Sequence, residues 1–168
     1  MAKKKPLSQQ VVVVAGGSYG LGRAIVRAVA DRGAEVVIGG RNREALDAAV
    51  GEVEAAGSEA IAIEMDVTRR DDVQQLVEQA VARFGRIDTY IANAMVTVYA
   101  EAHRLEDDEL HRVFDVNFFG GVYGYWASLP YLRDSRAWSS KRPCAPGSPG
   151  KVSKRLSGES CGFSSSVC

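Results

Sequence analysis

The first 143 residues contain no cysteine, because the three cysteines are Cys144, Cys161 and Cys168. A disulfide framework is therefore not expected. No apolar run approaches the roughly 20 residues that cross a bilayer, and the basic start MAKKKPLSQQ has no adequate apolar region behind it for a signal peptide. Three lysines at positions 3–5 are too few to indicate nucleic-acid binding. The sequence therefore predicts a cytoplasmic protein without a metal site, a nucleic-acid partner or a membrane segment.

Charge is unevenly distributed although the formal net charge is zero. Residues 1–135 hold 15 Lys and Arg against 20 Asp and Glu, whereas residues 136–168 hold six basic residues and one acidic residue. The second segment also contains nine serines and three of the five prolines, without hydrophobic periodicity. We therefore expect a disordered tail over 136–168, a flexible N-terminal tail over 1–9 with a solvated Lys5, and a folded domain over 10–135.

The folded part is organised around the segment VVVVAGGSYGLG, residues 11–22. Four consecutive β-branched residues are typical of a strand buried on both faces of a parallel sheet. Gly16, Gly20 and Gly22 then lead into an apolar helix. Backbone N–H groups at such a turn can bind a phosphate, because no Cβ atom keeps the ligand away. A turn that binds nothing is the alternative, and no Gly-Lys-Ser/Thr of a P-loop follows.

Strand and helix patterns alternate along the rest of this segment. Expected strands, after the first, are Glu35–Gly39, Ala60–Met65 and Ile87–Ala92, and expected helices are Leu21–Ala30, Arg43–Ala56, Asp71–Phe84 and Leu105–Ser128. Asn42 and a Thr68-x-x-Asp71 capping box should begin the second and third helices, and Pro130 should end the last. The alternation predicts an α/β fold, an incomplete Rossmann-like doubly wound parallel sheet with strand order 3-2-1-4. A ligand is expected at the carboxyl ends of the strands.

The end of the second strand bears on the choice of cofactor. An acidic residue at this position binds the ribose hydroxyls of NAD. Here the segment reads Gly39-Gly40-Arg41-Asn42-Arg43 and has no acid. Arg41 and Arg43 could pair with a 2′-phosphate, for which the guanidinium group is well suited. NADP(H) is therefore favoured over NAD, and the alternative is that both are ordinary surface arginines.

Four motifs in this order resemble the short-chain dehydrogenase/reductase family over about residues 10–135. Residues 15–22 (AGGSYGLG) are similar to its TGxxxGxG motif, and Asp66-Val67 to the pair that meets adenine. Residues 92–95 (ANAM) are similar to NNAG, and residues 115–120 (DVNFFG) to the segment that carries the catalytic Asn, here Asn117. The resemblance implies that the cofactor is bound by Gly16, Ser18, Tyr19, Gly20, Leu21, Gly22, Arg41, Asp66, Val67, Asn93 and Ala94.

Two of these motifs depart from the family pattern. Ala15 replaces a Thr and loses its hydroxyl hydrogen bond, and Met95 replaces a Gly and should crowd the backbone near the nicotinamide. Two implied site residues also have structural alternatives. Asp66 could be a strand-end turn residue, and Asn93 could join neighbouring strands through the backbone. His111 is expected on an exposed polar helix face, so neither it nor His103 is favoured as an acid–base group.

The family's reaction is hydride transfer between a nicotinamide and a carbonyl or alcohol substrate, with a Tyr activated by a Lys four residues later, and a Ser. No tyrosine follows Tyr131, and none of the six has a lysine at that spacing. The expected fifth strand is replaced near residue 137 by AWSSKRPC. We therefore expect an NAD(P)-dependent oxidoreductase by descent that is truncated, ends in a frameshifted tail and is inactive. Its homo-oligomer interface would be incomplete, leaving an apolar helix face on Val113–Trp126.

An alternative is a non-catalytic dinucleotide-binding or regulatory protein whose basic tail binds an acidic partner. The basic residues of this tail are Lys141, Arg142, Lys151, Lys154 and Arg155. Neither an amphipathic helix nor aromatic interleaving is present in the tail to support this alternative. The substrate and the direction of reaction do not follow from the sequence.

Overall fold

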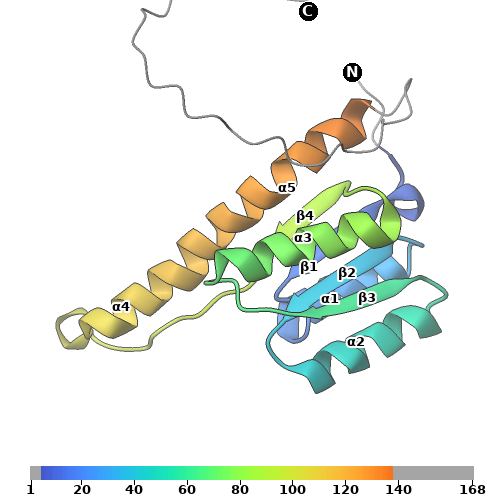
Figure 1. Ribbon diagram of the computed structural model, residues 1–168. Coiled ribbons are helices and arrows are strands. Elements are labelled where there is room, and N and C mark those ends of the chain that lie inside the picture. Colours follow the sequence, from blue (N-terminus) through green and yellow to red (C-terminus); the bar gives the residue numbers. More distant parts are fainter. Residues whose placement is uncertain (1–4, 138–168) are drawn as a thin grey trace, which may run out of the picture.

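The computed structural model describes residues 5–137 as a single α/β unit (Figure 1). The expected disorder and frameshift concern residues that lie almost entirely outside this range. Residues 136 and 137 are the exception, since they form the last positions of the final helix rather than part of a tail.

A four-stranded parallel sheet forms the centre of the structure. Its strands are β1 (Val11–Ala15), β2 (Glu35–Gly40), β3 (Ala60–Glu64) and β4 (Thr89–Ala92), in the order β3-β2-β1-β4. The register places Val13 beside Val37 on one side and Tyr90 on the other. This arrangement confirms the predicted fold class and strand order.

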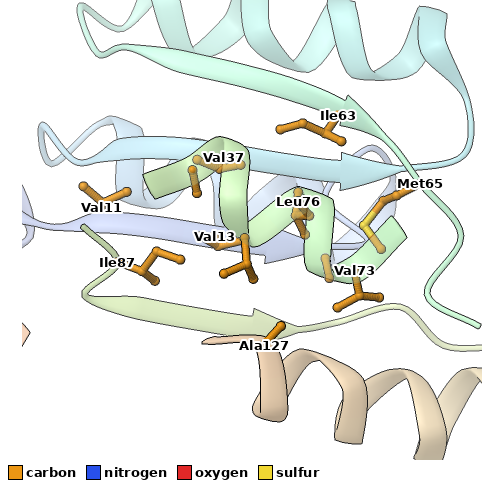
Figure 2. Packing of buried hydrophobic residues seen from close by; sticks show 12 residues of the cluster. Val11, Val13, Val37, Ile63, Met65, Val73, Leu76, Ile87 and Ala127 are labelled. Atoms are coloured by element: carbon orange, nitrogen blue, oxygen red, sulfur yellow. The ribbon is translucent and has the colours of Figure 1, made fainter. Parts of the chain in front are cut away.

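Helices cover both faces of the sheet (Figure 1). On one face lie α1 (Gly20–Ala30) and α2 (Arg43–Ala55), which pack on Val12 and Val14. On the other lie α3 (Arg70–Phe84) and α5 (Gly120–Ala137), which pack on Val11 and Val13. Figure 2 shows this second layer, with Val13, Val37, Leu76 and Ala127 packed together. Every residue of β1 is buried because helices shield both faces, as the run of valines predicts.

The long helical stretch before Ala137 differs from the prediction in two ways. It is divided into α4 (Asp107–Phe114), a π-helical turn η3 (Asp115–Phe119) and α5. Pro130 does not end it, but lies inside α5. A proline in a helix interior costs about 3 kcal/mol. Tyr131 and Leu132 beyond it pack against the core, and this packing keeps the helix continuous.

Two local predictions, the Thr68 helix cap and the solvated Lys5, are wrong because each side chain bonds to a nearby carboxylate instead. Thr68 does not cap α3, because its hydroxyl donates to Asp66 Oδ1 at 2.8 Å, and the helix begins after Arg69 without a side-chain cap. Lys5 is not solvated, since its ammonium group pairs with Asp88 at 2.8 Å. This pair fixes the start of the described chain beside β4, ahead of a short 3-10 turn, η1 (Leu7–Gln9).

The expected apolar helix face is exposed within the described part of the chain. Phe114, Phe118, Tyr125 and Trp126 are each more than half exposed. Strand β4 pairs with β1 alone, so its second edge is free of backbone partners among residues 5–137. None of the helices in this range is long and apolar enough to cross a membrane.

Candidate functional site

A cavity of about 370 Å³ lies where all four strands end at their carboxyl edge. The turns after β1, β2, β3 and β4 each contribute to its wall, and α4 and η3 contribute one residue each. Of the expected cofactor-binding residues, it is lined by Gly16, Ser18, Tyr19, Arg41, Asp66, Val67, Asn93 and Ala94. Gly20, Leu21 and Gly22 do not line it, because they form the first turn of α1 beside it.

The glycine turn between β1 and α1 is shaped by close approaches of the backbone. A Cβ atom on Gly22 would lie 1.9 Å from the carbonyl oxygen of Gly16, and a Cβ atom on Gly16 would lie 2.6 Å from the Ala94 nitrogen. Gly20 has a φ of +51°, with open space around the position a Cβ atom would take. Gly16 and Gly22 therefore close the turn, whereas Gly20 leaves room beside the N-terminus of α1. A phosphate group fits this combination of free N–H groups and space.

Ser18 presents an unused donor beside the cavity. The residue is only 6% exposed, and its hydroxyl makes no hydrogen bond with any residue of the described range. It lies against Gly40, where a Cβ atom would approach Ser18 Oγ to 2.8 Å. Because Ser18 lines the cavity and its Oγ is not a fully buried atom, the hydroxyl can hydrogen-bond a polar ligand bound there.

The two arginines after β2 have different surroundings. Arg43 forms a two-point ion pair with Asp47 on α2, with Nη2–Oδ1 at 2.8 Å and Nε–Oδ2 at 3.1 Å. Arg41 lines the cavity and has no ion pair with any residue from 5 to 137. Between them, Asn42 caps α2 by accepting from the Ala45 N–H at 2.7 Å, as predicted. Of these two arginines, only Arg41 lines the cavity.

Asp66 is a turn residue that also lines the cavity. Its Oδ1 accepts from the N–H and the hydroxyl of Thr68, at 2.9 and 2.8 Å, which makes it a turn residue. Its Oδ2 lies 3.7 Å from Arg112 Nη2, and both residues line the cavity. Burial alone raises the pKa of Asp66, but the Thr68 hydrogen bonds and the charges of Arg112 and Arg41 outweigh it and lower the pKa from its usual value. The carboxylate is ionised at neutral pH.

The turn after β4 closes the cavity on its other side. Asn93 Nδ2 donates to the Gly16 carbonyl at 3.0 Å, which confirms its expected backbone-bonding role. The N–H groups of Asn93 and Ala94 both donate to the Ala15 carbonyl, at 2.9 and 3.0 Å. Met95 lines the cavity with its side chain 76% exposed. Strands β1 and β4 are thus tied together at the site.

Asn117 lies in η3, next to a second cavity of about 30 Å³. Its side-chain amide is bonded to the backbone of Val96. His111 is exposed, and His103 lies beside Glu101 at 3.5 Å, and neither lines either cavity. Within residues 5–137 no group of three or more His, Cys, Asp or Glu could hold a metal ion.

The sequence did not identify several residues of the cavity wall. These are Gly40, Asn42, Met65, Val96, Arg112 and Val116, whereas Met95 was expected near the nicotinamide. Most of them adjoin predicted residues, so strand ends alone could have indicated them. Arg112 is different, because it is far from Asp66 in the chain and only the folded structure brings the two side chains within 3.7 Å. No local pattern marks it.

The sequence is similar to a family of known proteins over the residues that form the sheet and the cavity. The model of the short chain dehydrogenase family matches residues 10–139. The uncharacterized oxidoreductase YxnA of Bacillus subtilis is 39% identical over 129 residues, which cover 77% of this chain and 36% of that protein. Versicolorin reductase stcU of Emericella nidulans is 37% identical, over 76% of this chain and 49% of that protein.

The fold is also similar to solved structures of dehydrogenases. An alcohol dehydrogenase from the archaeon Thermococcus sibiricus, complexed with 5-hydroxy-NADP, superposes with a TM-score of 0.73 at 29% identity, over 75% of this chain and 54% of that one. The chain spans about half or less of the length of the curated relatives it matches.

Proposed function

The chain belongs to the short-chain dehydrogenase family, and on that premise we propose that its domain over residues 10–135 binds NADP(H) in preference to NAD(H). The main support for this preference is the difference between the two arginines after β2. Arg41 lines the cavity without an ion pair among the described residues, whereas Arg43 is held by Asp47. A guanidinium without an ion pair at this position favours a 2′-phosphate, and residues 39–43 at the end of β2 include no acidic side chain to bind a 2′-hydroxyl.

The residues around the cavity fit the parts of a dinucleotide. The N–H groups at the start of α1, with the space beside Gly20, suit the pyrophosphate. The Asp66 carboxylate suits the adenine amino group, and the turn after β4 suits the nicotinamide half. We assign cofactor binding to Gly16, Ser18, Tyr19, Gly20, Leu21, Gly22, Arg41, Asp66, Val67, Asn93 and Ala94.

When bound, the cofactor supplies a hydride that can be exchanged with the carbon of a carbonyl or alcohol substrate. Moving the accompanying proton requires an acid–base group near the reacting oxygen. The sequence contains no Tyr-x-x-x-Lys, so we propose that this chain binds the cofactor without turnover. Asn117 then retains a positioning role through Val96. A non-catalytic dinucleotide-binding protein is the alternative to an oxidoreductase that has lost its activity, and both have the same cofactor site.

Fluorescence titration of the full chain with NADPH and NADH tests cofactor binding. We expect a lower Kd for NADPH, and a loss of about 10- to 100-fold in NADPH affinity in Arg41→Ala, since a charge-assisted hydrogen bond contributes about 1.5–3 kcal/mol. NADH affinity should change little, and Arg41→Asp should favour NADH. Arg43→Ala is the matched control and should leave both Kd values unchanged. Equal losses in the two variants would contradict the assignment to Arg41.

A second experiment tests the absence of turnover. NADPH oxidation with simple ketones and aldehydes should stay at the rate of the enzyme-free mixture, while titration still shows binding. Turnover above that rate would contradict the proposal. Removal of residues 138–168 should leave the Kd unchanged, because every assigned site residue precedes them. A weaker Kd after this removal would instead favour a functional tail.

A further inference from the structure

Three charged side chains meet in the cavity wall, each from a different element. Arg41 follows β2, Asp66 follows β3, and Arg112 comes from α4. Arg41 and Arg112 are the only cationic side chains that line this cavity in the described part of the chain. Arg112 is the one at ion-pair distance, with Nη2 3.7 Å from Asp66 Oδ2.

Of the two oxygens of the Asp66 carboxylate, Oδ1 accepts hydrogen bonds within the turn and Oδ2 does not. Thr68 supplies both hydrogen bonds to Oδ1, so Oδ2 is the atom that faces other charged groups. Arg112 and Asp66 are partly exposed, at 43% and 28% of their side chains, so water reaches the pair. A solvent-exposed ion pair contributes little to the stability of the fold, but it still compensates the charge of Asp66. Without Arg112, the remaining cavity cation that could compensate Asp66 is Arg41.

We propose that Arg112 is a positioning residue that occupies the Asp66 carboxylate and thereby leaves Arg41 free for the 2′-phosphate of NADP(H). This inference rests on the proposed function, and it adds a specificity residue outside the glycine motif and the end of β2. Both arginines act on Asp66, since both lower its pKa. The three groups carry a net charge of +1, which favours the more anionic cofactor. Loss of Arg112 reduces this charge to zero and lets Asp66 attract Arg41.

The location of Arg112 supports a positioning role. It lies on α4, ahead of η3, where Asn117 binds the backbone of Val96. The helix α4–η3 is therefore attached at one point to the turn after β3 and at a second point to the turn after β4. Arg112 thus lines the cavity from a helix that continues into the turn joined to Val96.

The test is the ratio of NADH to NADPH dissociation constants, measured by titration of the full chain. Arg112→Met should lower this ratio about 3- to 10-fold, mainly through weaker NADPH binding. Arg112→Lys keeps the charge and should restore most of the ratio. Arg104→Met removes a cation that pairs with Glu101 outside the cavity, and should leave the ratio unchanged. Adenosine 2′,5′-bisphosphate against 5′-AMP should show the same pattern, which places the effect at the adenosine end.

A double-variant cycle separates the proposed route from a general charge effect. In an Asp66→Asn background the carboxylate is absent, so Arg112→Met should change the ratio much less than in the native background. An equal loss of NADPH and NADH affinity in Arg112→Met would overturn the inference, as would the same change of ratio in the Asp66→Asn background. If Arg112→Met does not fold, the same ratio is measured in Arg112→Gln, a second uncharged variant with good helix propensity. Absence of binding of both cofactors to the native chain would contradict the proposed function itself, and this inference with it.

Discussion

Asn117 holds both backbone polar groups of Val96 with a single side chain. The Val96 N–H donates to Asn117 Oδ1 at 2.9 Å, and Asn117 Nδ2 donates to the Val96 carbonyl at 2.8 Å. Asparagine has poor helix propensity, and here it lies in the π-helical turn η3. The pair joins this turn to the loop after β4, whose residue Val96 lines the large cavity.

Replacement of Asn117 by Ala should loosen that loop. Two hydrogen bonds are lost, each with a net value of about 0.5–1.5 kcal/mol. We expect faster hydrogen exchange at the Val96 amide and a several-fold weaker cofactor Kd. Asn42→Ala removes a helix cap of similar energy on α2 and is the control for exchange, since it should leave the Val96 amide protected. Unchanged protection of Val96 in Asn117→Ala would contradict this role.

Two glycine substitutions should act in opposite directions. Gly22→Ala places a Cβ atom 1.9 Å from the Gly16 carbonyl oxygen, so the turn has to move, at a cost of about 1–3 kcal/mol or more. Gly51 lies inside α2 with nothing near its Cβ position, and Gly51→Ala should stabilise the fold by about 0.5–1 kcal/mol. Urea unfolding measures both changes. Similar midpoints for the two variants would show that the turn tolerates a side chain.

Asp88 should make stability depend on acid pH. Burial raises its pKa, but hydrogen bonds from Lys5, Val11 and Arg86 outweigh burial and lower the pKa from its usual value. A lowered folded-state pKa stabilises the fold above the unfolded value, and this contribution is lost as pH falls through the lower folded value. Unfolding midpoints should therefore fall steeply below about pH 4.

The variant Asp88→Asn should reduce that dependence. Its unfolding midpoint is expected to be lower at pH 7 and to change less between pH 4 and pH 2. Asp31→Asn, at an exposed position after α1, is the control and should keep the acid dependence of the native chain. If the unfolding midpoint of Asp88→Asn falls below pH 4 as steeply as that of the native chain, other carboxylates cause the acid sensitivity.

Tyr90 should be replaceable by Phe without loss of stability. Its hydroxyl is buried and has no hydrogen-bond partner among residues 5–137, and burial raises its pKa to about 12. An unsatisfied buried polar group costs about 1–3 kcal/mol, so Tyr90→Phe should leave the midpoint of urea unfolding unchanged or raise it. Tyr99→Phe, at a 96% exposed position, should have no effect. A clear loss of stability in Tyr90→Phe would show that the hydroxyl has a partner.

Local patterns predicted the parts of the fold that depend on neighbouring residues. The valines of β1 had to be buried on both faces, and the glycine turn after them had to begin a helix. These features follow from side-chain shape and backbone freedom within about a dozen residues. The strand order and the place of the cavity were predicted from the alternation of strands and helices along the whole folded segment. The glycine turn itself indicated a phosphate site, whereas Asp66 and the other candidate residues were implied only by the resemblance to the family.

Other features depend on which side chain lies nearer after folding, and the sequence could not decide them. Arg41 and Arg43 are equivalent in the sequence, but the helix places Asp47 beside Arg43 alone. Pro130 is a helix breaker by local rules, and packing beyond it on the core keeps α5 intact. Arg112 Nη2 lies 3.7 Å from Asp66 Oδ2 although the two residues are far apart in the sequence. The sequence by itself determined the elements and the edge where a ligand binds, whereas the tertiary structure decided which charges face that ligand, because ion pairs form between residues that only folding brings within a few ångströms.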